Sequence, residues 1–198
     1  IIGGTKNPSL DKIRQLSPGL ILANQEENQL PHVEILAKDF PVFVTNIVSF
    51  KYNASLIYKL GTLLRVHEQA DQLRSRFLAA TKLSSSPSSR PKALYLIWRK
   101  PWMAAAKGTF INTMMEALGF ENLLAKFDRY PKISLDDLRP EVILLPDEPY
   151  DFSDADYEDL RSKFPDSKVV RVSGKDFSWY GSRPIYALPR LREQFSLA

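Results

Sequence analysis

Residues 53–83 read NASLIYKLGTLLRVHEQADQLRSRFLAATKL, and this stretch decides the fold that the sequence predicts. Its apolar residues recur at helical spacing: Leu56, Leu60, Leu63, Leu64, Ala70, Leu73 and Phe77. Asn53 is a candidate N-cap, and Gly61 weakens such a helix without having to break it. At about 1.5 Å per residue, one helix over this stretch would be about 45 Å long. That length is unusual inside a compact α/β domain and indicates a strut between two domains.

Residues 1–52, before this stretch, alternate between helix and strand. The predicted elements are a helix over residues 9–16, a strand over 20–23, a helix over 31–38 and a strand over 42–44. Ser9 is a candidate N-cap for the first helix, and Pro31 fits the first turn of the second. The unbroken apolar runs of the two strands are typical of a buried parallel sheet. These residues therefore predict a first α/β lobe.

Residues 84–198 repeat the alternation on a larger scale. A polar, turn-rich loop is predicted over residues 84–91. The elements that follow it are a strand over 93–98, helices over 109–118, 154–163 and 183–195, and strands over 142–145 and 169–172. Gly119 is placed to end the first of these helices. The sequence thus predicts a second α/β lobe after the long helix.

An internal echo links the two lobes. Ser9-Leu10-Asp11 and Ser134-Leu135-Asp136 each open a predicted short helix that is followed by a proline and an apolar strand. The echo places Asp11 and Asp136 at equivalent points of the two lobes. Ser-Leu-Asp is also a common way to start a helix, so the echo alone is a weak sign of symmetry.

The composition excludes several classes of site. The chain has 198 residues, 44% of them hydrophobic and 25% charged, which is typical of a globular protein. Its 27 basic and 23 acidic residues nearly balance, so nothing favours a nucleic-acid partner. There is no cysteine, which excludes disulfides, iron–sulfur clusters and cysteine nucleophiles. No apolar run approaches the roughly 20 residues that cross a bilayer, and no signal peptide is visible.

Motifs of catalysis and of metal binding are missing as well. The chain has no phosphate-binding loop, no dinucleotide fingerprint and no nucleophile elbow. His32 and His67 are too few and too far apart in the sequence to predict a metal site. We therefore expect no enzyme activity, no intrinsic cofactor and no resident metal.

Four segments carry a resemblance to a known family. They are GGTKNPSLD at residues 3–11, PGLILANQEEN at 18–28, EALGFEN at 116–122 within the segment 98–123, and WYGSRP at 179–184. In their order along the chain they resemble the class III, helical-backbone (TroA-like) periplasmic substrate-binding proteins of ABC importers. The cobalamin-binding and iron-siderophore subgroup is the most similar. Each motif alone is unspecific, but together they span nearly the whole chain.

The resemblance implies an α/β fold of two lobes with parallel-type sheets joined by one long backbone helix. The lobes would be residues 1–52 and 84–198, with the helix over 53–83 between them. In the family the first lobe begins with a further strand–helix–strand unit. Nothing precedes Ile1 in the sequence, so we expect the first lobe to be incomplete at its N-terminus.

A ligand cleft is expected between the lobes, lined by loops at the carboxyl ends of parallel strands. The residues predicted to contact the ligand are Thr5, Lys6, Asn24, Glu26, Trp102, Met103, Tyr130, Trp179, Tyr180 and Arg183. Their aromatic rings suit a large, partly planar ligand. Lys6, Arg99 and Arg183 could pair with its anionic groups. The resemblance implies that this ligand is cobalamin, haem or a ferric siderophore.

The resemblance also implies a permease as partner. In the family an acidic residue on each lobe docks onto the permease, and Asp11 and Asp136 match these places, with Asp137 as a rival to Asp136. A carboxylate near a helix N-terminus also has a purely structural explanation, the helix dipole. A receptor of this kind is expected to be a monomer, periplasmic or anchored to the outer side of a membrane.

One alternative has a different function. A cytosolic α/β enzyme or a ligand sensor could be built on the related chelatase-like or nitrogenase-like scaffold. Such an enzyme would need an acid–base pair in its cleft, and the sequence offers none that we can assign.

Overall fold

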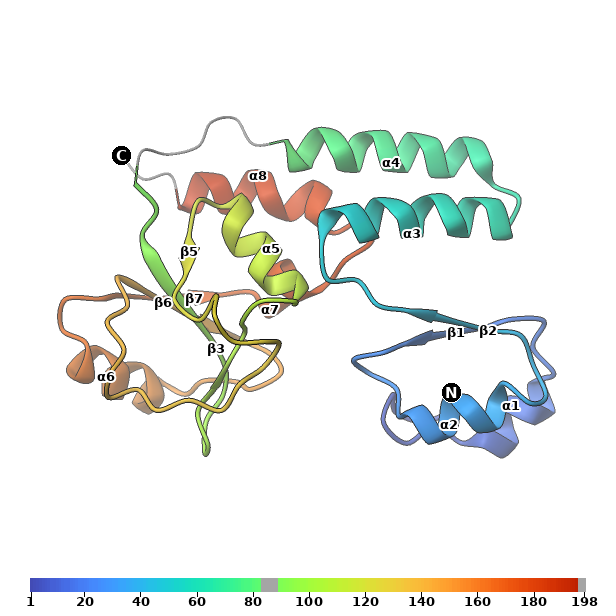
Figure 1. Cartoon of the computed structure of the whole chain (residues 1–198), viewed down its shortest axis with the longest axis horizontal. Coiled ribbons are helices and arrows are strands. Elements are labelled where there is room, and N and C mark those ends of the chain that lie inside the picture. Colours follow the sequence, from blue (N-terminus) through green and yellow to red (C-terminus); the bar gives the residue numbers. More distant parts are fainter. Residues whose placement is uncertain (83–88, 196–198) are drawn as a thin grey trace. The chain divides into compact units, whose positions relative to one another are not determined.

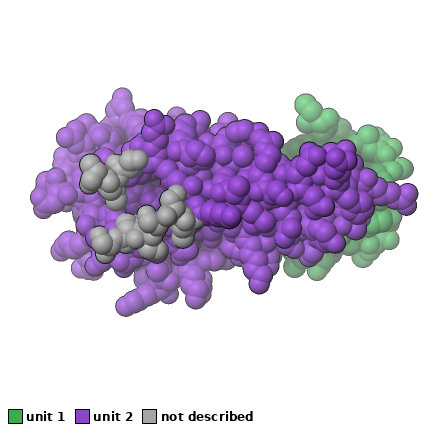
Figure 2. All heavy atoms as spheres, turned by 90° about the horizontal axis from the view of Figure 1, so that it is seen from above, with its two compact units in different colours: residues 1–46 green, residues 47–198 purple. Residues whose placement is uncertain are grey.

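The chain forms two compact units in a computed structural model that describes residues 1–82 and 89–195. Unit 1 comprises residues 1–46 and unit 2 residues 47–198, shown in green and purple in Figure 2. The division therefore falls before the stretch 53–83, which belongs to unit 2. Residues 84–88 of the predicted polar loop, and Leu83 at the end of the predicted long helix, lie outside the described residues. In the described parts of the chain, no helix combines the length and the apolar character needed to cross a membrane.

Unit 1 contains the four predicted elements in the predicted order: α1 (Leu10–Leu16), β1 (Ile21–Asn24), α2 (Leu30–Leu36) and β2 (Val42–Thr45). The two strands pair in parallel, with Ile21 opposite Val42. The Ser9 hydroxyl accepts a hydrogen bond from the Lys12 N–H at 3.4 Å, so the predicted N-cap is confirmed. Figure 1 shows both helices on one side of the strands. Leu22 in β1 is 54% exposed, because two strands with helices on one side cannot bury a whole sheet.

The prediction of one helix over residues 53–83 is wrong. This stretch lies in two helices, α3 (Phe50–Leu63) and α4 (His67–Thr81), which run side by side as a hairpin (Figure 1). Arg65 takes the left-handed conformation, with φ at 57°. The Val66 N–H donates to the Gly61 carbonyl at 2.8 Å and the Arg65 N–H to the Thr62 carbonyl at 3.2 Å. This is the Schellman pattern, which ends a helix and turns the chain back.

The expected N-cap of this stretch is also corrected. Ser49 caps α3, since its hydroxyl accepts a hydrogen bond from the Tyr52 N–H at 3.4 Å. Asn53 instead lies one turn inside the helix and is fully buried. It is therefore available for a contact outside its own helix.

The hairpin packs through small residues and rings. A Cβ atom added to Gly61 would lie 2.2 Å from the Ala70 Cβ, so the two helices meet where neither carries a bulky side chain. Ala54, Ile57, Ala70 and Phe77 form a buried cluster against Ile185 of α8 (Pro184–Gln194). The hairpin is thus part of the core of unit 2 rather than a free strut.

Replacing Gly61 by alanine is expected to lower the free energy of unfolding by about 1–3 kcal/mol, because the added methyl forces the two helices apart. Urea unfolding measures the change. The double variant Gly61→Ala with Ala70→Gly removes the clash from the other side and should recover most of the loss, apart from a helix-propensity penalty of about 1 kcal/mol for the new glycine. A single variant as stable as the wild type would contradict the close crossing.

The sheet of unit 2 is mostly parallel, as predicted. Its strands are β3 (Lys92–Trp98), β4 (Met103–Ala104), β5 (Glu121–Asn122), β6 (Val142–Pro146) and β7 (Lys168–Val172). The order is β4-β3-β6-β7, β5 pairs with β3, and only β4 runs antiparallel among these strands. The helices are α5 (Phe110–Ala117), α6 (Asp154–Lys163), α7 (Gly174–Ser178) and α8. β6 is buried along its whole length, which matches its unbroken apolar run.

Residues 134–138 do not form the helix that the echo predicted. The segment is a turn, in which the Ser134 hydroxyl accepts from the Asp136 N–H at 3.2 Å. Pro140 follows closely and disfavours helical backbone at Arg139. The Arg139 guanidinium also donates to the carbonyls of Asp136, at 2.9 Å, and Leu138, at 2.8 Å. Carbonyl groups that a helix would use are therefore taken by a side chain.

Candidate functional site

In unit 1, two loops that the sequence placed at a ligand site lie against each other. The Thr5 hydroxyl donates to the Glu27 carboxylate at 3.2 Å, and the Asn28 amide donates to the Thr5 carbonyl at 2.9 Å. The Lys6 ammonium donates to the carbonyl of Glu26. The Asn24 side-chain oxygen accepts from the Glu26 N–H at 2.8 Å and so shapes the second loop. The four predicted residues of unit 1, Thr5, Lys6, Asn24 and Glu26, are thus brought together.

In unit 2, three loops leave the carboxyl ends of parallel strands. Residues 99–102 follow β3, residues 147–153 follow β6, and residues 173–183, which include the short helix α7, follow β7. Neighbouring parallel strands end at the same edge of a sheet, where α/β proteins commonly bind ligands. The middle loop is tied to the third, since the Gly174 N–H donates to the Asp147 carboxylate at 2.7 Å. A Cβ on Gly174 would lie 2.6 Å from the Glu148 carbonyl oxygen, so glycine is required for this approach.

Among the aromatic rings on these loops, Trp179 is the most exposed. It is 51% exposed, yet its indole N–H donates to the Glu148 carboxylate at 2.9 Å. The Lys175 ammonium lies 5.4 Å and the Arg183 guanidinium 5.7 Å from the centre of the ring. The ring is therefore held in one orientation and flanked by two cations, while half of its surface faces solvent.

Arg183 is anchored by a buried carboxylate. Asp176 is almost fully buried, and its carboxylate accepts from the Arg183 Nε at 2.9 Å and Nη2 at 2.8 Å. Arg190 pairs with the other oxygen of the same carboxylate. A ligand anion would thus share the Arg183 charge with Asp176 instead of finding it free.

The loop that carries Trp179 is fastened to the helical hairpin. The buried Asn53 amide donates to the Gly181 carbonyl at 2.9 Å, and its oxygen accepts from the Gly181 N–H at 2.7 Å. Gly181 has φ at 78°, a conformation that favours glycine. Tyr180, beside it, packs its ring edge-on to Phe110 at 6.2 Å. Sequence reasoning missed the role of Asn53, which it interpreted as a helix cap.

Trp102 belongs to a second group of rings. Trp102 stacks on Phe152 at 6.3 Å, Phe152 meets Tyr150 at 4.8 Å, and Tyr150 meets Trp98 at 5.2 Å. Arg99 covers the Trp102 ring at 5.2 Å. Trp98 is 42% exposed. Trp98 and Tyr150 were not predicted, although both stand at strand ends, the same signal that singled out Trp179.

Two of the predicted rings of unit 2, Trp179 and Trp102, therefore stand in different groups. Glu148 contacts Trp179 in the first group, and Tyr150 contacts Trp98 in the second, so the loop after β6 joins them. Met103, also predicted, lies in β4 opposite Trp98. Tyr130, half-buried, lies under the guanidinium of Arg129, 6.0 Å from the ring centre.

The two carboxylates predicted to dock have different surroundings. Asp11 is 89% exposed at its side chain and lies 3.6 Å from Arg14. Asp136 lies 2.7 Å from the Lys163 ammonium, and its other oxygen accepts from the Ser134 hydroxyl at 2.9 Å. The hydrogen bonds from Lys163 and Ser134 lower the pKa of the Asp136 carboxyl. Asp136 is thus anionic and already paired in the free protein.

Beneath the strand-end loops lies a buried phenol. Tyr95 of β3 packs on Phe177 at 5.1 Å, and its hydroxyl has no hydrogen-bond partner among the described residues. Burial raises the pKa of this phenol well above its usual value, and the Asp147 and Glu148 carboxylates raise it further. Among all the residues that the structure describes, no group of three or more histidine, aspartate and glutamate side chains could hold a metal ion.

Replacing Tyr95 by phenylalanine is expected to raise stability at pH 7 by up to about 1 kcal/mol, because an unpaired buried hydroxyl is removed. The phenol ionises more readily in the unfolded chain. Ionisation of Tyr95 therefore leaves the free energy of unfolding of the wild type unchanged below about pH 10 and lowers it as the pH rises further. Urea unfolding at neutral and alkaline pH checks both points. A phenylalanine variant that is clearly less stable at pH 7 would show that the hydroxyl has a partner.

Comparison with known proteins gives a family and a fold. The family model described as "Periplasmic binding protein" matches residues 2–161. A possible iron-binding, periplasmic solute-binding protein of Staphylococcus epidermidis has a similar structure, with a TM-score of 0.78 at 20% identity over 98% of this chain and 82% of that one. The periplasmic vitamin B12 binding protein of Vibrio cholerae gives 0.80 at 18% over 98% and 80%. A periplasmic haem binding protein of Pseudomonas aeruginosa gives 0.79 at 18% over 98% and 77%. A search of curated protein sequences finds no significant match.

Proposed function

The chain belongs to the periplasmic binding protein family, and from that premise we propose that it is the substrate-binding component of an ABC importer. It captures a large chelate with a planar face, either a cobalamin-like corrinoid, haem or a ferric siderophore, and presents it to a permease. Three solved structures with the same fold support this ligand class, since their proteins are described as binding vitamin B12, haem and, possibly, iron.

One observation on this chain carries the proposal: the oriented, half-exposed Trp179 at the carboxyl edge of the sheet. Its hydrogen bond to Glu148 fixes the plane of the indole, and the Asn53–Gly181 hydrogen bonds fix the loop that holds it. An immobilised ring offers contact area at little further loss of conformational entropy. Such a ring suits the flat face of a macrocycle better than a small polar solute.

The neighbouring residues add selectivity. Lys175 and Arg183 flank the indole and can face carboxylate groups at the rim of the ligand. Trp98, which contacts Tyr150 of the loop after β6, gives a second exposed ring. The loops with Thr5, Lys6, Asn24 and Glu26 stay a predicted contact surface of unit 1, as do Trp102, Met103, Tyr130 and Tyr180 in unit 2.

Asp11 and Asp136 are the proposed contacts with the permease. Both lie on exposed surfaces of their own units, and each carries a negative charge for a basic side chain of the partner. Capture of the ligand and its presentation to the permease require no covalent bond to be made or broken, so the proposed role includes no catalysis. We propose an extracytoplasmic, monomeric receptor, either periplasmic or membrane-anchored.

The proposal is tested by ligand titration. Protein expressed from the whole reading frame is titrated with cyanocobalamin, haemin and a ferric hydroxamate siderophore, and binding is followed by quenching of tryptophan fluorescence and by calorimetry. One of the three is expected to bind with a dissociation constant of about 1 μM or tighter, corresponding to roughly −8 kcal/mol. If none of the three binds, the proposed ligand class is wrong.

A further inference from the structure

Asp176 in unit 2 is a buried carboxylate that is paired with two arginines. Its side chain is 3% exposed, and one of its oxygens accepts from the Arg183 Nε at 2.9 Å and Nη2 at 2.8 Å. The other oxygen pairs with Arg190. Arg183 stands at the start of α8 and Arg190 lies about two turns of helix later, so both side chains reach the same side of α8. Two guanidinium groups therefore meet one carboxylate, which leaves this cluster with an excess of positive charge.

The excess charge matters because further carboxylates lie nearby. Burial raises the pKa of the Tyr95 phenol, and three carboxylates around it raise it further: Asp147, Glu148 and Asp176. Three cations belong to the same loops and to α8, two beside the Trp179 ring and one on Asp176: Lys175, Arg183 and Arg190. The positive and negative charges of these side chains balance. Without Arg190 the negative charges would outnumber the positive ones, and an anionic ligand would be repelled.

Arg183 keeps part of its guanidinium open. The bonds to Asp176 use Nε and Nη2, whereas Nη1 has no hydrogen-bond or ion-pair partner among the described residues. The Arg183 side chain is 36% exposed, and its guanidinium carbon lies 5.7 Å from the centre of the Trp179 ring. An arginine has several N–H donors, so one edge can stay on Asp176 while another binds a second carboxylate. Arg183 is therefore oriented for an anionic group beside Trp179.

We propose that Arg190 is a positioning residue for an anionic ligand. It offsets the charge of Asp176, so that Asp176 orients Arg183 without cancelling the charge that Arg183 offers to a ligand carboxylate. The inference rests on the proposed function and narrows its ligand class to flat chelates that carry carboxylate groups at the rim. Haem carries such groups, whereas the rim of a corrinoid such as cyanocobalamin carries uncharged amides.

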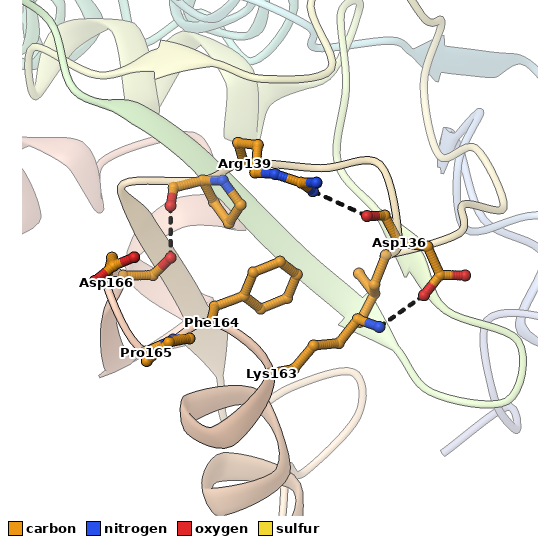
Figure 3. Close-up of a pocket in the computed structure, with 9 residues that line it drawn as sticks. Asp136, Arg139, Lys163, Phe164, Pro165 and Asp166 are labelled. Carbon is orange, nitrogen blue, oxygen red and sulfur yellow. Dashed lines mark hydrogen bonds and ion pairs between the residues drawn. The ribbon is translucent and has the colours of Figure 1, made fainter.

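Three variants test the role of Arg190. Arg190→Gln removes its charge and leaves Asp176 paired with Arg183, so the buried carboxylate keeps a partner. Arg190→Lys is the conservative variant that retains the charge. Lys163→Gln is the matched control, because it removes one positive charge from an exposed ion pair in α6. Figure 3 shows this pair, in which the Lys163 ammonium lies 2.7 Å from the Asp136 carboxylate.

The probes are benzoate and benzamide, which share a flat ring and differ in a carboxylate against an uncharged amide. Isotope-labelled protein is titrated with each at constant ionic strength, and NMR follows the Trp179 indole N–H and the Arg183 Nε–H. Benzoate is expected to bind the wild type about fivefold tighter than benzamide, because only its carboxylate forms a charge-assisted hydrogen bond. Arg190→Gln should reduce this preference below about twofold without weakening benzamide. Arg190→Lys and Lys163→Gln should retain the preference.

A purely structural role of Arg190 predicts a different result. A disturbed site would bind both probes more weakly in Arg190→Gln, and retaining the charge in Arg190→Lys would not restore the preference. Either outcome contradicts the proposal. So does a wild type that binds benzoate no better than benzamide or shows no shifts at tens of millimolar benzoate. A preference that survives in Arg190→Gln, or that is lost equally in Lys163→Gln, also overturns it.

The failure of this inference and the failure of the proposed function are distinguishable. The wild type and Arg190→Gln are titrated in parallel with haemin, cyanocobalamin and the ferric hydroxamate siderophore. Haemin is expected to bind the wild type most tightly and to lose about fivefold in Arg190→Gln. Tighter binding of cyanocobalamin, or haemin binding that is independent of Arg190, contradicts the inference alone. An Arg190-dependent preference for benzoate with no panel member bound contradicts the proposed ligand class and leaves an anion site beside Trp179.

Discussion

Replacing Trp179 by alanine is expected to weaken ligand binding by about 30-fold or more, the effect of losing a central aromatic contact worth at least about 2 kcal/mol. The ring is oriented by Glu148 and half-exposed, so its free surface is available to the ligand rather than to the core. The free energy of unfolding should change by less than about 1 kcal/mol for the same reason. Calorimetric titration with whichever panel member binds measures the first effect, and urea unfolding the second.

Two further variants make this result specific. Trp179→Phe keeps a flat ring but loses the fused five-membered ring and the N–H that it donates to Glu148, so it should recover part of the affinity. Trp98→Ala removes the exposed ring of the second group and is expected to have the smaller effect. A larger loss for Trp98→Ala than for Trp179→Ala would place the ligand against the second group of rings instead. Full affinity in both variants would contradict a ligand at this edge of the sheet.

Replacing Asn53 by alanine is expected to lower the free energy of unfolding by about 2–4 kcal/mol, because two hydrogen bonds are lost and the backbone of Gly181 is left unpaired. Asn53 is fully buried and meets both the N–H and the carbonyl of Gly181. Alanine suits a helix better than asparagine, so the loss cannot come from helix propensity. The same variant should also bind ligand more weakly, since the loop with Trp179 loses its fastening.

Urea unfolding and ligand titration of the same sample measure both effects of Asn53→Ala. Gln72→Ala, on the exposed face of α4, is the control and should leave stability within about 0.5 kcal/mol of the wild type. A stable Asn53→Ala protein with normal ligand affinity would show that the loop holds its shape without the helical hairpin.

The elements themselves were predictable because their signals are local. The apolar runs of β3 and β6, the N-cap at Ser9, and the alternation of strands with helices all depend on residues near one another in the chain. The rule that parallel strands end at one edge then pointed to the loop of Trp179. The structure confirms the α/β class, with parallel strands in both units.

The helical hairpin formed by α3 and α4 is a feature that local sequence signals did not predict. Apolar spacing continues from α3 to α4, and Leu63 and Leu64, which support one long helix, are exposed at the turn instead. Helix α3 ends at the left-handed backbone of Arg65. Helix α4 then packs against α3 through the contact of Gly61 with Ala70. A residue with a side chain rarely adopts that conformation, so only the packing between the helices could reveal it.

The amino-acid sequence by itself determined the α/β class, the position of most helices and strands, and the strand-end loops on which the candidate ligand residues lie. Only the tertiary structure decided which side chains meet. It joined Asn53 to Gly181, Trp98 to Tyr150, and Asp136 to Lys163. The physical reason is that periodicity and capping act within one or two turns of chain, whereas these contacts join residues tens of positions apart that only the packing of the whole unit brings together.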